Sequence, residues 1–193
     1  MNHAPAILSR LHGVDVALAR IERASAGGLC ALVFVLITAN VIVRTLKIPV
    51  FWIDEAAVYA MVWMAFLAAS AAIQSGQHIA VTLVVDALPE SLARQARRMS
   101  NLIVLALGLA CLVLSWMWFD PVGLARSGGD LTAFSDRTLN FIYTEPTVSF
   151  TAPKFLFWLI MPIFSVGITL HAMVRLITEW DLPAPTALNG GVD

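Results

Sequence analysis

The chain alternates long apolar runs with short polar segments. Four runs contain no Asp, Glu, Lys or Arg: 24–43, 56–77, 99–119 and 155–174. Each has about the ~20 residues that a helix needs to cross ~30 Å of hydrocarbon. The run at 102–113 is almost continuously apolar and does not alternate, which favours helices over a transmembrane β-barrel. The pattern predicts an all-α integral membrane protein with four transmembrane helices, at about 24–45, 53–76, 99–119 and 154–177.

Composition agrees with this interpretation. Hydrophobic residues make up 59% of the 193 residues and charged residues only 13%, which is more apolar surface than a soluble domain of this size could cover. Three apolar runs follow the first, so we expect the first helix to be retained and not cleaved as a signal peptide. We expect residues 1–181 to form one membrane domain and the Pro-rich tail 182–193 to be disordered.

Two further segments have the pattern of short interfacial amphipathic helices. In residues 6–22, apolar side chains recur at steps of three and four: Ile7, Leu11, Val14, Leu18 and Ile21. This pattern predicts a helix lying on the inner leaflet. The linker 78–98 has a helix-start signal at Pro89. Its basic residues Arg94, Arg97 and Arg98 share a helical face and are expected among lipid phosphates, although a solvated basic loop that fixes topology would explain them equally well.

The distribution of Lys and Arg predicts the orientation. Seven basic residues fall on the side of the N-terminus: Arg10, Arg20, Arg23, Arg94, Arg97, Arg98 and Arg175. Five fall on the other side: Arg44, Lys47, Arg126, Arg137 and Lys154. Because cytoplasmic segments carry the excess of basic residues, we expect both termini in the cytoplasm and 120–153 as an outer loop. The net charge of -1 gives no reason to expect a nucleic-acid partner.

Polar residues gather where the first two helices meet on the outer side. Arg44 closes the first helix, and Trp52, Asp54 and Glu55 open the second. A short connection makes these helices antiparallel neighbours, so Arg44 can reach Asp54 or Glu55, and Trp52 stands where an interfacial anchor belongs. Three interpretations remain open: capping with a structural ion pair, contact with a partner subunit, and direct handling of an ion or substrate.

A ridge of small residues follows on the second helix. Ala68, Ala72 and Gly76 recur at spacing four. In lipid, such a ridge lets another helix approach closely. The ridge therefore allows a partner subunit without naming one.

The chain carries few groups that could do chemistry. The runs contain no paired acids, Ser-His arrangement or HExxH motif, so we do not expect an enzyme. Cys30 and Cys111 lie in apolar runs and are expected to pack as small hydrophobic residues, without a disulfide or metal. The main alternative is a haem-bearing membrane anchor of a respiratory oxidoreductase, with His78 and His171 as axial ligands.

The residues between 40 and 88 also resemble a known family. They are Asn40, Val41, Ile42, Val43, Arg44, Trp52, Asp54, Glu55, Tyr59, Trp63, Phe66, Leu67, Ala71, Gly76, His78, Ile79 and Val81. This string resembles the small, DctQ-type permease subunit of tripartite ATP-independent periplasmic (TRAP) transporters. Pro162, early in the fourth helix, is similar to a proline that the family often carries.

The resemblance implies a bacterial inner-membrane subunit that works with two partners. A periplasmic binding protein would deliver an organic acid, and a large permease subunit would hold the substrate and coupling-ion sites, the ion being sodium. The chain itself would be a scaffold in this symport, without a cofactor. By the resemblance, one set of residues would order its outer end: Arg44, Trp52, Asp54, Glu55, Tyr59 and Trp63. Gly76 and His78 would order the inner turn.

The outer loop 120–153 is long for this family. It carries several aromatic residues, among them Phe134, Phe141 and Tyr143. We expect it to fold over the outer face and to contact the large subunit or the binding protein.

Overall fold

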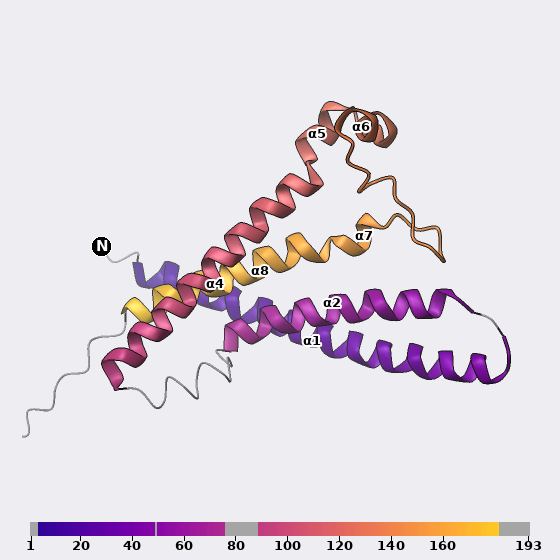
Figure 1. The fold of residues 1–193 in the computed structure, drawn as a ribbon. Coiled ribbons are helices and arrows are strands. Elements are labelled where there is room, and N and C mark those ends of the chain that lie inside the picture. Colours follow the sequence, from indigo (N-terminus) through magenta and orange to yellow (C-terminus); the bar gives the residue numbers. More distant parts are fainter. Residues whose placement is uncertain (1–3, 49, 76–88, 182–193) are drawn as a thin grey trace, which may run out of the picture.

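Four long helices form the molecule. The computed structural model describes residues 4–48, 50–75 and 89–181. The long helices are α1 (Ala4–Thr45), α2 (Trp52–Ser75), α4 (Glu90–Phe119) and α8 (Ile160–Asp181), and the short ones are α5 (Pro121–Arg126), α6 (Leu131–Thr138) and α7 (Phe155–Trp158) (Figure 1). Four segments of the described chain are long and apolar enough to cross a membrane. This confirms the predicted all-α fold with four candidate spans.

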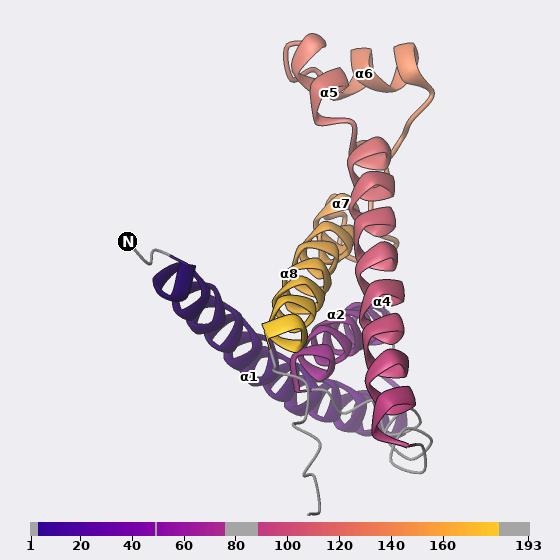
Figure 2. The same ribbon diagram turned by 90° about the vertical axis from the view of Figure 1, so that its left-hand side faces the viewer.

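The helices pack as two pairs. α1 packs along α2, α4 packs along α8, and α2 and α8 join the pairs. A small buried core of Ala26, Leu67 and Ile160 lies where α1, α2 and α8 meet. α4 approaches α8 closely at Gly108, where an added Cβ would lie 3.2 Å from backbone atoms of Thr169. Figures 1 and 2 show α4 leading away from the α1–α2 pair to α5 and α6.

Large apolar side chains cover the outward faces of these helices. Phe34 on α1 is 72% exposed, and Ile103 and Trp116 on α4 are each 62% exposed. A soluble protein rarely exposes so much contiguous apolar surface. Lipid or other membrane helices must therefore cover it.

The expected interfacial helices differ from the structure. The helix expected at 6–22 is continuous with the first span, since α1 is one helix of 42 residues, about 63 Å long. Likewise, α4 begins at Glu90, directly after Pro89, and not at residue 99. No proline interrupts either junction, so the backbone stays hydrogen-bonded within one helix.

The face of the first half of α1 that packs inside the protein carries acidic residues. Val14 and Ile21, on the apolar side expected to face the inner leaflet, are 56% and 63% exposed. The buried residues form what we call the acidic stripe, at steps of four, three and four: Asp15, Ala19, Glu22 and Ala26. The exposed apolar residues leave the expected lipid-facing side open. The hydropathy pattern did not predict the burial of the two carboxylates, to which α2 and α8 offer polar partners.

The outer connection at 120–153 is an ordered structure. Asp120 ends α4 in a left-handed conformation, with φ 36°, and its side chain caps α5 by accepting a bond of 2.8 Å from the Gly123 N–H. Asp130 caps α6 in the same way, accepting from the N–H groups of Thr132 and Ala133. These are favoured capping residues. Residues 139–154, which we call the outer strap, then lead back to α7.

Candidate functional site

The outer end of α1 and α2 holds the expected ion pair. Arg44 Nη2 lies 2.8 Å from Asp54 Oδ2, which confirms that these side chains meet. Asn40 donates its side-chain N–H to the other carboxylate oxygen of Asp54 and accepts from Arg44 Nε at 3.3 Å. The ion-pairing side chains are 70% and 50% exposed, so this group joins two helix ends while remaining open to solvent.

Glu55 binds the outer strap and not Arg44. Its carboxylate accepts the backbone N–H of Val148 at 3.0 Å and that of Ser149 at 2.6 Å. It also accepts the Tyr59 hydroxyl at 3.1 Å. Hydrogen bonds from backbone N–H groups to a carboxylate are among the stronger ones in proteins. One side chain thus fixes a segment more than 90 residues away in sequence.

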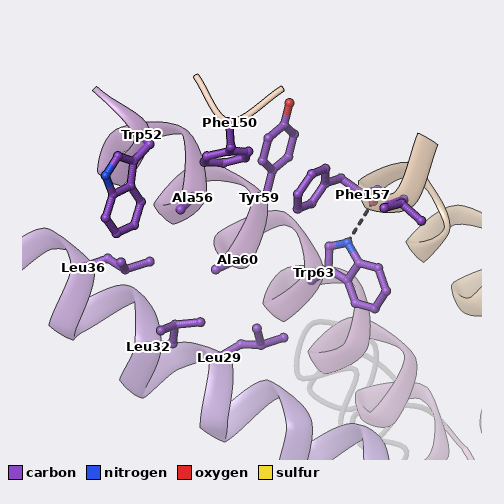
Figure 3. A pocket seen from close by; sticks show the side chains of 11 residues that line it. Leu29, Leu32, Leu36, Trp52, Ala56, Tyr59, Ala60, Trp63, Phe150 and Phe157 are labelled. Atoms are coloured by element: carbon purple, nitrogen blue, oxygen red, sulfur yellow. Dashed lines mark hydrogen bonds between the residues drawn. The ribbon is translucent and has the colours of Figure 1, made fainter. Parts of the chain in front are cut away.

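Tyr59 and Trp63 continue this contact toward the bilayer. The Tyr59 ring stacks on Phe157 with centroids 4.0 Å apart, and Trp63 Nε1 donates to the Phe157 carbonyl at 2.8 Å. Figure 3 shows these rings beside a groove of about 480 Å³ whose other wall comes from α1, at Leu29, Leu32 and Leu36. Trp52 lies at the outer edge of the groove. The lining is apolar, which suits hydrocarbon and not a carboxylate.

The outer strap is also tied to the end of α4. Tyr143 donates its hydroxyl to the Phe119 carbonyl at 2.6 Å, and Asn140 donates to the Trp118 carbonyl at 2.7 Å. Burial, assisted by the negative charge of Asp120, raises the pKa of Tyr143 above its ordinary value. The strap therefore connects the outer ends of both helix pairs.

Lys154 fixes the far end of the strap. Its Nζ lies 2.7 Å from Glu145 Oε1. The hydrogen bond that Lys154 donates to the Glu145 carboxylate raises the pKa of Lys154 above its ordinary value, although desolvation opposes this. This contact closes the strap onto the start of α7.

A second polar group lies at the other end of the bundle and is buried. His171 on α8 sits between two carboxylates of the acidic stripe. Its Nδ1 lies 2.6 Å from Asp15 Oδ1 and its Nε2 lies 3.0 Å from Glu22 Oε2. Ser70 on α2 donates to Glu22 Oε1 at 2.7 Å. We call these four residues the inner cluster; His171 and Ser70 are 0% exposed and the two acids 3% exposed.

Gly167 leaves room for the inner cluster. A Cβ at this position would lie 2.6 Å from both Glu22 Oε1 and Ser70 Oγ. No other residue type fits without displacing these oxygens. Three helices thus converge on one set of polar atoms.

The remaining predicted residues are dispersed. Ala68 is exposed and Ala72 half-buried, while Gly76 and His78 lie outside the described residues. Arg94, Arg97 and Arg98 lie on the first turns of α4, all half-buried. The two cysteines are free thiols, Cys30 exposed and Cys111 half-buried.

The haem-anchor alternative gains no support. Of its two histidines, His171 has both ring nitrogens directed at carboxylate oxygens, so neither nitrogen is available to a metal in this arrangement. His78 lies outside the described residues.

Sequence reasoning missed the inner cluster. The amphipathic pattern at 6–22 pointed to its apolar residues and not to Asp15 or Glu22, and His171 was considered only as a haem ligand together with His78. A usable signal was present, because acids seven residues apart share one helical face and a histidine inside an apolar run needs polar partners. The pairing of α1 with α8 was not visible in the sequence.

Comparison with known proteins identifies the family of the chain. No curated protein and no solved structure matches the chain significantly. The family of the DctQ component of tripartite ATP-independent periplasmic transporters matches residues 33–182. The match includes Ser70 and His171 and begins after Asp15 and Glu22. It covers more than half of the chain, which therefore belongs to the DctQ family of transporter components.

Proposed function

We propose that this multi-pass membrane protein is the scaffold subunit of a TRAP transporter in a bacterial inner membrane. It would support a large permease subunit that takes up an organic acid together with a sodium ion. A periplasmic binding protein would deliver the organic acid to that subunit. Both termini would lie in the cytoplasm, with α5, α6 and the outer strap on the periplasmic side. Family membership supports the transporter role, and the surface of the chain supports the scaffold role.

The observation that carries the scaffold role is an uncovered surface of small residues in the middle of α1. Ala24, Gly27, Gly28 and Ala31 are all exposed, and nothing lies within 4 Å of a Cβ built on either glycine. Glycine destabilises a helix interior by about 1 kcal/mol relative to alanine. Lipid contact gives no reason for two glycines, whereas close approach of another membrane helix does.

The small residues of α2 extend the same argument. Ala65, Ala68 and Ala69 are exposed although α1 and α8 both pack on this helix. The apolar lining of the large outer groove also argues against a site for a carboxylate in that part of the chain. A supporting surface for the large subunit fits these features better than a transport pathway through this chain.

The test is recovery of the large permease subunit with the tagged chain from detergent-solubilised membranes. Gly28→Leu adds a side chain that meets nothing in this subunit, so its own thermal stability should not fall. If a partner helix covers Gly28, we expect a loss of co-purified large subunit of roughly tenfold, equivalent to about 1.4 kcal/mol, with a parallel loss of sodium-dependent uptake.

Gly13→Leu provides the matched control. It is the same substitution on the same helix, also with nothing within 4 Å, but closer to the N-terminus. Full recovery of the large subunit with Gly28→Leu, or an equal loss with Gly13→Leu, would remove the support for this docking surface.

A further inference from the structure

The inner cluster cannot satisfy its hydrogen bonds without an additional proton. Both nitrogens of His171 face carboxylate oxygens, at 2.6 and 3.0 Å. A neutral imidazole has one N–H donor and one lone pair, and an ionised carboxylate can only accept. With two ionised acids and a neutral ring, one nitrogen lone pair would face a carboxylate lone pair. One proton, on the ring or on an acid, removes this conflict.

Because the inner cluster is buried, α1 can contact α8 there only when the additional proton is bound. The side chains of Asp15 and Glu22 are each 4% exposed and that of His171 is 0% exposed. Because the paired atoms are only 2.6 and 3.0 Å apart, no water fits between them to supply a missing donor. An unsatisfied buried charge is strongly unfavourable. The α1–α8 contact and the bound proton therefore depend on each other.

A cavity borders the inner cluster on the side of Asp15. It has a volume of about 200 Å³ and is lined by His12 and Asp15 of α1, Gln74 of α2, and Val174, Arg175 and Thr178 of α8. On the other side of the cluster, Glu22 borders an apolar cavity of about 410 Å³. Exchange with water is thus open on the side of Asp15, toward the side of the membrane where α1 begins.

Among the described residues, the groups around the inner cluster do not replace the additional proton as a partner of the two carboxylates. α2 presents the uncharged Ser70 and Gln74, and α8 presents Arg175, whose Nε donates to the Gln74 carbonyl at 3.2 Å. His12 of α1 is exposed at the cavity. α4 packs on α8 and carries Arg94, Arg97 and Arg98 on its first turns. The described residues include no group of three acids, histidines or cysteines suited to a metal ion.

We propose that Asp15, Glu22 and His171 form a proton-binding site whose occupancy holds the N-terminal half of α1 on α8. The site is loaded at low and neutral pH, and α1 is closed on α8. As the pH rises and the proton leaves, the facing lone pairs repel and α1 separates from α8. The subunit therefore senses the pH on the side of its N-terminus. This inference does not rest on the proposed scaffold function.

The experiment measures the α1–α8 distance in the full chain in lipid nanodiscs between pH 5 and pH 10. Spin labels are attached at Gly13→Cys, which has open space, and Met173→Cys, which is 37% exposed. Cys30 and Cys111 are replaced by serine. We expect one narrow distance at low pH and its loss at high pH.

In two variants, an amide N–H₂ group provides the hydrogen-bond donor that otherwise requires the additional proton. In Glu22→Gln, the amide N–H₂ donates to the ring lone pair while its oxygen still accepts from Ser70. In Asp15→Asn, the amide donates to the other ring nitrogen. Both complete the hydrogen bonds without an added proton, so both should keep the narrow distance up to pH 10. Glu55→Gln is the same substitution at the opposite end of the molecule. In this variant, α1 should separate from α8 at high pH as it does in the unmodified chain.

The result is decisive in either direction. Retention of the narrow distance at high pH in both amide variants, together with its loss in the unmodified chain, supports the site. A pH-independent distance in the unmodified chain, or opening of the amide variants over the same pH range, overturns it.

Discussion

The two ends of this molecule use the same chemical groups in opposite surroundings. At the outer end, Asp54 pairs with Arg44 where the side chains are 50% and 70% exposed. At the inner end, Asp15 and Glu22 meet His171 where the side chains are 4%, 4% and 0% exposed. Both ends join α1 to a neighbouring helix, yet only the inner one does so out of contact with water.

This difference in exposure determines how much each contact contributes. An exposed ion pair contributes about 0–1 kcal/mol because water and salt screen it. Breaking a buried pair costs about 3–5 kcal/mol because one charge remains without a partner. The side chains at the outer end can therefore rearrange with little loss of free energy when another protein approaches. Those at the inner end permit only one arrangement.

The largest expected effect comes from His171→Ala. This change leaves two buried carboxylates facing an empty space, and we expect a loss of about 3–5 kcal/mol in the free energy of unfolding. Unfolding in mixed detergent micelles, followed by circular dichroism, measures it. His12→Ala is the matched control, because His12 is exposed. A loss below about 1 kcal/mol would show that the contact is not buried in the membrane-embedded protein.

A smaller effect is expected from Gly167→Ala. The added Cβ would lie 2.6 Å from both Glu22 Oε1 and Ser70 Oγ, and overpacking of this kind costs about 1–3 kcal/mol. The same unfolding measurement applies. Gly28→Ala, which meets nothing within 4 Å, should instead be neutral or stabilising by up to about 1 kcal/mol. Equal effects of the two alanines would contradict the close approach at Gly167.

The smallest effect is expected from Arg44→Ala. The exposed pair with Asp54 should contribute at most about 1 kcal/mol, and its contribution should shrink further when salt is raised from 0.05 M to about 0.5 M. Asp54→Ala also removes the acceptor of the Asn40 N–H, so it should lose somewhat more, and the double variant should lose no more than Asp54→Ala alone. A loss as large as that of His171→Ala would remove the contrast between the two ends.

The sequence was informative wherever neighbours in the chain are also neighbours in space. Four apolar runs predicted four spans, and the short connection between the first two helices predicted that Arg44 meets Asp54 or Glu55; the structure shows the contact with Asp54. Both depend on local spacing alone. The helix start after Pro89 was equally visible.

The contacts that sequence reasoning missed join distant segments. Glu55 meets Val148 and Ser149 more than 90 residues later, and Asp15 meets His171 across 156 residues. Hydropathy alone assumes that polar side chains face water, so it did not predict that Asp15 and Glu22 on the first half of α1 are buried. A carboxylate with a buried partner reverses that assumption.

The length of α1 has a consequence for the bilayer. Its segment Leu8–Thr45 has 38 residues, about 57 Å of helix, against ~30 Å of hydrocarbon. Fitting it entirely within the hydrocarbon would require a tilt of roughly 60°, beyond the 0–40° that transmembrane helices adopt. The first turns therefore leave the hydrocarbon, and the depth at which they do so depends on hydrophobic mismatch. Bilayer thickness, set by acyl-chain length, thus acts mechanically on the same part of α1 that rests on α8.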